Sequence, residues 1–408
     1  MKTAVWMTTA IILTIGGVTH AASYTVLHSF AVADGTAPYG SPLIVNGTLY
    51  GTTEAGGSNN AGTLFALGLQ TNSFNVLHTF SYSNTADGSN PYGGGLAALG
   101  ATLYGVAEGG GTNNDGIVYQ FDTGTKAFGI VHSFGAEGDG AFPVQTTLTQ
   151  SDGILYGVTH SGGVNNRGIV YSINTTASNQ YIVKHPFTTS EGSDPMGTPM
   201  IVGSTLYGTT NDGGTSNDGT VYKMDTASGA VITLHTFTGA TSDGKFPWGS
   251  SVVSSGSSLY GMTIEGGTAD KGVIYKMDTT GGNFQILHSF TAGVADGWQP
   301  FGDLLIDGSM AYGMTSGGGA GAEGIIFQLD LTTSQFTILH SFSGGDEGEP
   351  FGSLVKDGSS LYGFTRGEAA TGGQGAIFKI DLAVPEPGAV CLMASGAILW
   401  TIRRQRRG

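Results

Sequence analysis

Cysteine is almost absent from this 408-residue chain, because its one cysteine is Cys391, close to the C-terminus. The rest of the chain has no thiol for a disulfide, a cysteine-ligated zinc ion or a thiol nucleophile. Charged residues are also scarce, at 11%, and 15 basic residues face 30 acidic ones. The net charge of −15 repels phosphate backbones, so we expect no nucleic-acid partner. The same acidity would also keep an exported protein soluble.

Glycine, in contrast, is abundant, with 71 residues, and aromatic residues make up 10% of the chain. Disordered chains are poor in aromatic residues, so the glycines are better interpreted as turn residues in a chain that reverses direction often. The chain is too long for one ordinary compact core. It should therefore hold several domains, or an array in which neighbouring units bury one another.

Residues 1–22 have the layout of a secretory signal peptide. Lys2 precedes an apolar run, and the small residues Ala21 and Ala22 follow it. We expect cleavage after Ala21 or Ala22. A retained anchor helix is the alternative, which the shortness of the run disfavours. Export without disulfides is compatible with a bacterial envelope or surface protein.

Residues 384–408 combine three features in a fixed order. Pro385-Glu386-Pro387 precedes the apolar segment 388–402, and a cluster of arginines ends the chain. The apolar segment is shorter than the usual membrane span of about 20 residues, but the basic cluster is typical of a cytoplasmic stop. This order resembles the PEP-CTERM sorting signal of Gram-negative bacteria that make extracellular polysaccharide.

The resemblance implies three properties of the chain. An exosortase-type sorting machinery would be a partner, and the chain would touch the membrane through its C-terminal segment before processing. The protein would finally reside in the cell envelope, at the cell surface or in the extracellular matrix. A permanent anchor is the alternative for this segment.

Two short motifs recur seven times with a period of about fifty residues, in the range of propeller repeats. The first is of the Leu-Tyr-Gly type, with its tyrosines at Tyr50, Tyr104, Tyr156, Tyr207, Tyr260, Tyr312 and Tyr362. The second is of the Leu-His-Ser-Phe type, with its histidines at His28, His78, His132, His185, His235, His288 and His340.

One unit shows how four strands arise. Asn46-Gly47 lies between two short apolar segments, and this dipeptide best supplies the two positive φ angles of a tight hairpin turn. After a glycine-rich loop, two further β-type segments begin at Gly62 and Phe74. A sheet of this kind cannot bury both faces alone, so the units must stack around an axis.

The two ends of the array predict that it closes into a ring. Residues 24–30 form a lone fourth strand, whereas the last unit, 354–382, supplies only three. Pairing them completes a seventh blade and removes the exposed edges of an open array. An open solenoid would instead need capping repeats. We predict an all-β fold, a seven-bladed β-propeller of four-stranded blades over residues 23–383, followed by a short apolar C-terminal helix.

The repeat over residues 24–382 resembles the bacterial tandem repeat named GloVer, in which a PEP-CTERM or similar anchor often follows, and more distantly kelch. It departs from kelch in lacking the tryptophan that usually marks the fourth strand. The resemblance implies fold and location, and no activity.

Residues that repeat in all seven units are expected to serve architecture. For the histidines we favour a hydrogen bond to a neighbouring loop over a ring of metal ligands. The Asp-Gly loops lack the close carboxylate spacing that calcium needs, so turn formation is the better interpretation. We predict no metal and no cofactor.

The residue after the loop proline opens the innermost strand. These residues are Tyr39, Tyr92, Val144, Met196, Trp248, Phe301 and Phe351. Their aromatic rings are candidates for stacking on sugar faces at the channel rim. Wedge packing between blades is the alternative, which Val144 and Met196 would serve equally well.

The position four residues after the repeated tyrosine differs from unit to unit. Its residues are Glu54, Glu108, His160, Asn211, Ile264, Ser316 and Arg366. The long loops that join strand two to strand three and strand four to the next strand one lie on the same face of the ring, which we call the long-loop face. Polar residues that differ between blades on this face are what a ligand site would use. Drift at a tolerant loop position explains the same variation.

Two functions follow from this pattern. The first is a non-catalytic binding or scaffolding module, with extracellular polysaccharide as the candidate ligand. The second is a carbohydrate hydrolase or lyase that uses Glu54 and Glu108, assisted by His160 or Arg366. Propellers host both kinds of function. The sequence favours binding, because no compact catalytic motif interrupts the repeats.

Overall fold

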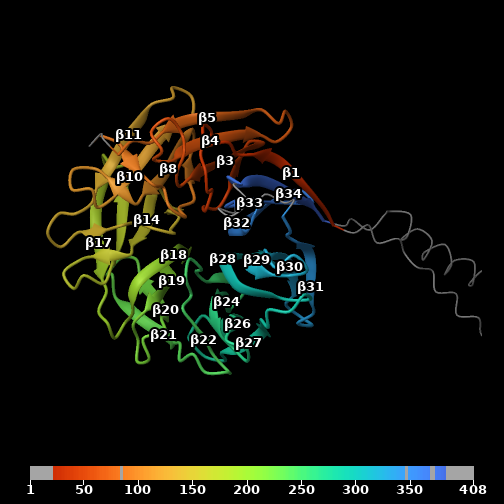
Figure 1. Cartoon of the computed structure of the whole chain (residues 1–408). Helices are drawn as coiled ribbons and strands as arrows, with labels where there is room; N and C mark the ends of the chain where they lie inside the picture. The colour runs from red at the N-terminus through yellow and green to blue at the C-terminus, as the bar shows by residue number, and fades with distance from the viewer. Residues whose placement is uncertain (1–21, 83–85, 345–347, 368–372, 383–408) are drawn as a thin grey trace, which may run out of the picture.

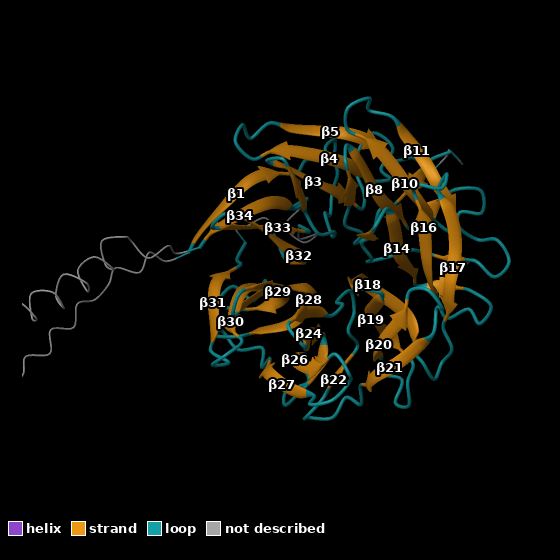
Figure 2. Ribbon diagram, turned by 180° about the vertical axis from the view of Figure 1, so that it is seen from behind, coloured by secondary structure: helices purple, strands orange, loops and turns teal. Residues whose placement is uncertain are grey.

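The computed structural model describes residues 22–82, 86–344, 348–367 and 373–382. These residues form seven four-stranded antiparallel sheets around a central axis (Figure 1). The predicted seven-bladed β-propeller is therefore confirmed. The described residues contain no helix, and thus none that could cross a membrane (Figure 2). The predicted C-terminal helix and sorting motif, and all but the last residue of the predicted signal peptide, lie outside the described residues.

In each blade the strands follow one another from the innermost to the outermost in the order of the hydrogen-bonded sheet. Blades 1 and 2 comprise β2 (Leu43–Val45), β3 (Thr48–Thr53), β4 (Thr63–Gly68) and β5 (Phe74–Thr79), then β7 (Ala97–Leu99), β8 (Thr102–Ala107), β10 (Ile117–Asp122) and β11 (Phe128–Ser133). Blades 3 and 4 comprise β13 (Thr149–Ser151), β14 (Ile154–Thr159), β16 (Ile169–Asn174) and β17 (Gln180–Pro186), then β18 (Ser193–Val202), β19 (Thr205–Asp212), β20 (Thr220–Asp225) and β21 (Val231–Thr236).

The remaining blades follow the same order. Blades 5 and 6 comprise β23 (Val253–Ser255), β24 (Ser258–Thr263), β26 (Val273–Asp278) and β27 (Gln285–Ser289), then β28 (Gly297–Asp307), β29 (Met310–Gly318), β30 (Ile325–Asp330) and β31 (Phe336–Ser341). Blade 7 comprises β32 (Pro350–Asp357), β33 (Ser360–Thr365), β34 (Ala376–Asp381) and β1 (Ser23–Ser29). Three small two-stranded sheets are formed by β6 (Gly88–Ser89) with β9 (Gly109–Gly110), β12 (Gly140–Ala141) with β15 (Ser161–Gly162), and β22 (Gly244–Lys245) with β25 (Glu265–Gly266).

The hairpin between the two inner strands forms as predicted. Asn46 and Gly47 have φ values of 51° and 73°, the paired positive angles that a two-residue turn of this kind requires. Leu43 then pairs with Tyr50 across β2 and β3. The hairpins of this type lie on the face opposite the long loops.

Ring closure occurs between the two ends of the described chain. β1 pairs antiparallel with β34, with Tyr24 opposite Ile380, and the Phe30 amide donates to the Gly375 carbonyl at 2.9 Å. The N-terminal strand is thus the outermost strand of the last blade. This confirms the predicted closure, which leaves no unpaired blade edge at the junction.

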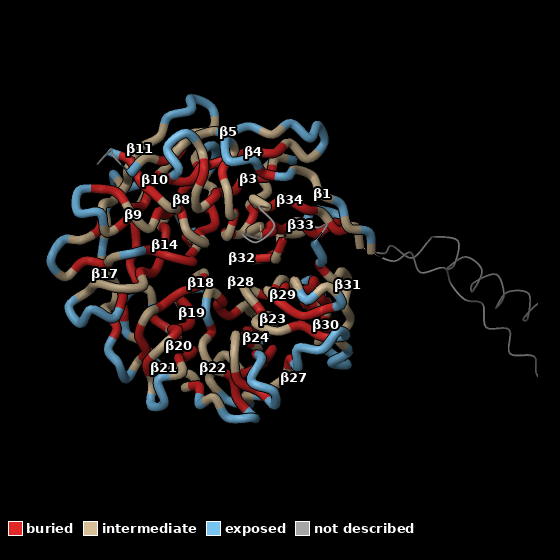
Figure 3. Tube along the Cα trace, viewed as in Figure 1, coloured by how far each residue is buried: buried red, intermediate tan, exposed pale blue. Residues whose placement is uncertain are grey.

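The glycine of each Leu-Tyr-Gly motif is required by an aromatic ring on the neighbouring strand. Gly157 pairs with Tyr171, and a methyl group added to Gly157 would lie 2.5 Å from Cζ of that ring. Tyr171 is fully buried and belongs to a cluster that joins two adjacent blades. The tube coloured by burial accordingly shows buried segments within the blades and exposed loops at the periphery (Figure 3). Each of the seven clusters of buried apolar residues joins two adjacent blades, so most of the core lies between blades.

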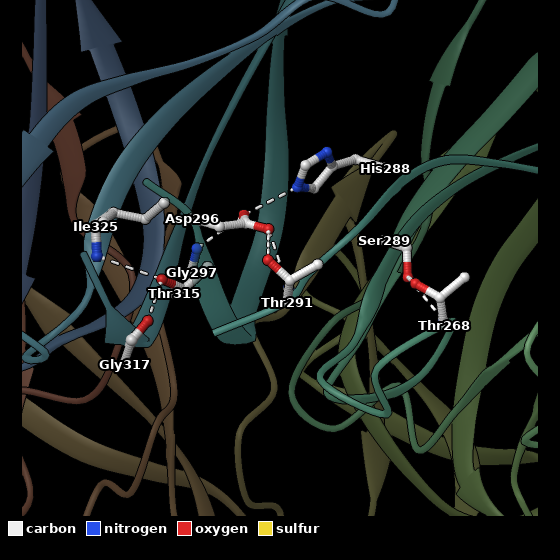
Figure 4. A network of polar contacts seen from close by, with 9 residues as sticks. All are labelled: Thr268, His288, Ser289, Thr291, Asp296, Gly297, Thr315, Gly317 and Ile325. Carbon is white, nitrogen blue, oxygen red and sulfur yellow. Dashed lines mark hydrogen bonds and ion pairs between the residues drawn. The ribbon is translucent and has the colours of Figure 1, made fainter. Parts of the chain in front are cut away.

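Among the described residues, six of the repeated histidines pair with an acid in the loop that enters the next blade. His288 Nε2 lies 3.0 Å from Asp296 Oδ1, and the same carboxylate accepts hydrogen bonds from the Gly297 amide and the Thr291 hydroxyl (Figure 4). The His288 ring also stacks on Phe336 of the next blade, with centroids 4.0 Å apart. Corresponding acid pairs are His28–Asp34, His78–Asp87, His132–Asp139, His185–Glu191 and His235–Asp243. The expected contact of the repeated histidine with a neighbouring loop is confirmed for these six.

Candidate functional site

Two adjoining depressions surround the axis on the long-loop face. The larger has a volume of about 590 Å³ and the smaller about 300 Å³, and Tyr92 and Trp248 line both. We call the two together the axial basin. The larger half is lined by Glu54, Tyr92, Glu108, Phe142, Val144, His160, Ser161, Met196 and Trp248. The smaller half is lined by Tyr92, Trp248, Ile264, Trp298, Gln299, Phe301, Ser316, Glu349, Phe351 and Arg366.

The floor of the basin is built from the residues that follow the loop prolines. Ring centroids lie 5.0 Å apart for Tyr39 and Tyr92, 4.8 Å for Tyr39 and Phe351, and 3.9 Å for Phe301 and Phe351. These rings therefore pack on one another beside the axis. Trp248 is 37% exposed, whereas Phe351 is only 6% exposed. The floor combines packing with at least one ring that is open to a ligand.

The walls are built from the position at which the units differ. Glu54, Glu108 and His160 line the larger half, and Ile264, Ser316 and Arg366 line the smaller half. Five of them directly follow the second strand of their blade, and Ser316 lies within β29. Asn211, which is 7% exposed, is not among the residues that line the basin. The structure thus brings six of these seven residues together around one hollow.

The acidic half of the basin has perturbed protonation equilibria. Burial raises the pKa of Glu54, and the charge of Glu108 raises it further, against a smaller opposing effect of Arg366. Burial also raises the pKa of Glu108. Desolvation lowers the pKa of His160, although Asp212 and Glu108 oppose this. These side chains are therefore electrostatically coupled across the blades.

Asp212, at the end of β19, belongs to the same electrostatic neighbourhood. Burial, together with a hydrogen bond to Asp194 and the charge of Asp194, raises its pKa to about 6. Two carboxylates in contact favour sharing one proton, because both cannot ionise at low cost. The pair lies beside His160, whose pKa the Asp212 charge raises in turn.

Arg366 is held rigidly in the other half. It forms an ion pair with Glu349, and its Nη1 donates to the Tyr39 hydroxyl at 3.5 Å. Its guanidinium carbon lies 5.2 Å from the Phe351 ring centroid and 5.8 Å from that of Tyr39. The Arg366 guanidinium therefore packs against the aromatic rings of the floor.

The residue before each loop proline was missed by the sequence analysis. Its members are Ala37, Asn90, Phe142, Asp194, Phe246, Gln299 and Glu349, and the first six have positive φ values of 49° to 56°. Their carbonyls accept the amide of the wall residue, as in Glu108 to Asn90 at 2.9 Å and His160 to Phe142 at 3.1 Å. Phe142, Gln299 and Glu349 line the basin. Variation between units, the criterion already applied four residues after the tyrosine, would have found this position.

A second layer, mostly of polar residues, lies further along the axis, two or three residues after the floor residue of each unit. Its residues are Ser41, Gly95, Thr147, Thr198, Ser251, Asp303 and Ser353. Burial raises the pKa of Asp303 to about 6, despite a hydrogen bond from the Ser251 amide. The described residues contain no group of three or more histidine, cysteine, aspartate or glutamate side chains that could hold a metal ion.

Comparison with known proteins gives one family and a set of similar folds. The model of the family described as Gloeobacter/Verrucomicrobia repeat matches residues 14–219 and 200–390. No curated protein matches the chain by sequence. An oligogalacturonate lyase solved in complex with manganese is 15% identical, with a TM-score of 0.57 over 90% of this chain and 94% of that one.

A puromycin-hydrolyzing peptidase from Mycobacterium tuberculosis is 14% identical, with a TM-score of 0.52 over 84% of this chain and 52% of that one. At these identities the likeness extends to the fold alone. The propeller architecture is therefore shared with enzymes, and the chemistry has to be argued from the basin.

Proposed function

The chain belongs to the Gloeobacter/Verrucomicrobia repeat family, and we propose that its axial basin is a non-catalytic binding site for a saccharide, such as a segment of extracellular polysaccharide. One observation carries the proposal: the 37%-exposed Trp248 and the Tyr92 ring line the same open hollow as the polar side chains of several blades. Aromatic faces stack on sugar rings, and fixed polar groups orient their hydroxyls.

The charge of the basin narrows the saccharide class. Three lining carboxylates, Glu54, Glu108 and Glu349, face one lining guanidinium, Arg366, which is already paired with Glu349. A polyuronate would meet like charge at Glu54 and Glu108. We therefore expect a neutral or amino-bearing saccharide, in contrast to the polyanion named for the oligogalacturonate lyase.

A carbohydrate hydrolase or lyase is the second candidate, and the acidic half of the basin supports it. Glu54 and Glu108 both have raised pKa values in one hollow, and His160 lies beside them. Acid–base catalysis on a saccharide uses paired carboxylates whose environments differ. Against this, both carboxyls here are shifted in the same direction by the same cause, burial.

Binding and cleavage can be separated on the full chain, purified in detergent. A glycan array with neutral, amino-bearing and uronate saccharides identifies the ligand, and reducing-end release is measured on the same saccharides. Trp248→Ala should abolish binding, whereas Tyr82→Ala, which removes an exposed ring outside the basin lining, should not. Release of reducing ends that is lost in both Glu54→Gln and Glu108→Gln would establish the enzyme instead.

We further propose that the protein is exported and sorted to the envelope, surface or matrix. The arguments are the signal-peptide layout of residues 1–22 and the order of Pro385-Glu386-Pro387, apolar segment and arginine cluster. Cell fractionation should find the protein outside the cytoplasm, and removal of residues 384–408 should release it into the medium. Retention of the truncated chain on the cell would contradict a sorting role for that segment.

A further inference from the structure

The polar layer below the aromatic floor is tied together across the blades. The Ser251 amide donates to Asp303 Oδ1 at 2.6 Å, the Asp303 amide to Ser353 Oγ at 2.8 Å, and the Ser353 amide to Ser41 Oγ at 3.1 Å. Gly95 donates to Thr147 Oγ1 at 3.1 Å in the same way. In these four bonds the amide of one blade donates to a side-chain oxygen of the next blade. The bond from Ser353 to Ser41 joins the last blade to the first.

A narrow cavity lies inside this layer. Its volume is about 20 Å³, which is room for one particle the size of a water molecule. The oxygen-bearing side chains that line it are Tyr39, Ser41, Gln145, Thr147, Thr198, Asp303 and Ser353. Among these lining residues Asp303 is the only acid, and none is basic. The cavity therefore combines one negative charge with neutral oxygen atoms.

A buried acceptor without a partner faces the same space. Gln145 is only 5% exposed, and its Nε2 donates to the Tyr92 hydroxyl at 3.1 Å. Within the described part of the chain its Oε1 has no hydrogen-bond partner. A methyl group added to Gly249, which also lines the cavity, would lie 3.2 Å from this oxygen. A buried amide oxygen left without a donor costs free energy, so a ligand that supplies positive charge is favoured there.

We propose that this cavity binds one monovalent cation of the sodium class, held by the Asp303 carboxylate, the Gln145 amide oxygen and the hydroxyls of Thr147 and Thr198. Its single carboxylate selects the charge. A divalent ion would leave one positive charge uncompensated in a region shielded from water. Magnesium would in addition need room for the waters that it retains.

Bound at the axis, the ion contacts oxygens from several blades at once. Residues 145 and 147 precede β13, the inner strand of blade 3, whereas Thr198 and Asp303 lie in β18 and β28, the inner strands of blades 4 and 6. The cation would therefore link several blades and stabilise the closed ring. This inference is independent of what the basin binds.

The test is the thermal unfolding of the full chain at constant ionic strength, as choline chloride is replaced by sodium chloride at pH 8. We expect a saturable rise in Tm with sodium and little rise with caesium, which is too large for the cavity. Asp303→Asn should abolish the sodium-dependent rise. Asp152→Asn, which makes the same charge change at an exposed hairpin turn, should leave it intact.

If Asp303→Asn does not fold, sodium binding to the wild-type protein can be measured directly. The ²³Na NMR line of a sodium chloride solution should broaden when the wild-type protein is added. It should become narrow again when potassium or lithium competes for the site. Thr198→Val, which replaces one hydroxyl by a methyl group, should weaken sodium binding at least tenfold. Equal Tm in sodium, caesium and choline, or an unbroadened ²³Na line, would show that the cavity holds water only and would overturn the proposal.

Discussion

The outermost strands of the blades, which we call the outer wall, and the axial basin are made from the same seven units. The two regions differ in symmetry. On the outer wall the histidine and its acid partner recur from blade to blade, as in His78–Asp87 and His288–Asp296. In the basin, equivalent positions carry glutamate, histidine, isoleucine, serine or arginine. The comparison teaches that repeated positions hold the blades together, whereas the varied positions are free to form a site.

The contact between blades 3 and 4 departs from the pattern of the outer wall. Six of the seven histidine rings stack on an aromatic ring of the adjoining blade, including His340 of blade 6 on Tyr24 of blade 7, with centroids 4.1 Å apart. Among the described residues, His185 makes an aromatic contact only with Phe187 of its own blade, and its acid partner is Glu191 rather than aspartate. The joint between blades 3 and 4 therefore has fewer interactions.

We expect the largest loss of stability at a contact between blades that has both the histidine–acid pair and the stacked ring. His132→Ala removes a ring that stacks on Tyr181 at 3.6 Å and a hydrogen bond to Asp139, which is 7% exposed. We expect a loss of about 3 kcal/mol in the free energy of unfolding. His185→Ala, at the joint without the stacked ring, should cost about 1 kcal/mol. Urea unfolding measures both, and equal losses would show that the stacked ring adds nothing.

A substitution at a varied position should change binding while the fold is retained. Ile264→Glu places in blade 5 the residue that blades 1 and 2 have at the same position. We expect the free energy of unfolding to change by no more than about 0.5 kcal/mol, because the side chain lines an open hollow. Calorimetric titration should show tighter binding of an amino-bearing saccharide and weaker binding of a uronate. The neutral variant Ile264→Gln is the control.

The pH dependence of binding should report the shifted carboxyls of the basin. Burial raises the pKa of Glu108 above the ordinary value of 4.5 for glutamate, so its charge is lost at a higher pH than that of a free glutamate. Binding of an amino-bearing saccharide should therefore weaken as the pH falls from 7.5, with a midpoint above 4.5. Glu108→Gln should flatten the profile. An unchanged profile in that variant would place the titrating group elsewhere.

The smallest effect is expected at a repeated core position where the blades differ by one atom. Tyr171 is fully buried, and within the described residues its hydroxyl has no partner. Phenylalanine occupies the equivalent place in blades 1, 6 and 7, as Phe65, Phe327 and Phe378. Tyr171→Phe should raise the free energy of unfolding by up to about 1 kcal/mol. A loss of stability would reveal a bound donor or acceptor at this hydroxyl.

Much of the fold could be predicted because it depends on short-range patterns. The two positive φ angles at Asn46 and Gly47, the strand boundaries and the count of one surplus and one missing strand all follow from local residue choice and repeat phase. Part of the site followed from the same phase. Variation between aligned units singled out Glu54, Glu108, His160 and Arg366, all of which line the basin.

The sequence by itself determined the seven units, the closure of the ring and the face on which the varied residues gather, because these depend on periodicity along the chain. Only the tertiary structure decided which varied residues meet. It leaves Asn211 out of the basin lining, adds Phe142, Gln299 and Glu349 to it, and gathers Asp303 and Gln145 around one axial cavity. The physical reason is that the radius at which each inner strand lies and the direction of each side chain are set by packing against other blades, and no single unit contains that information.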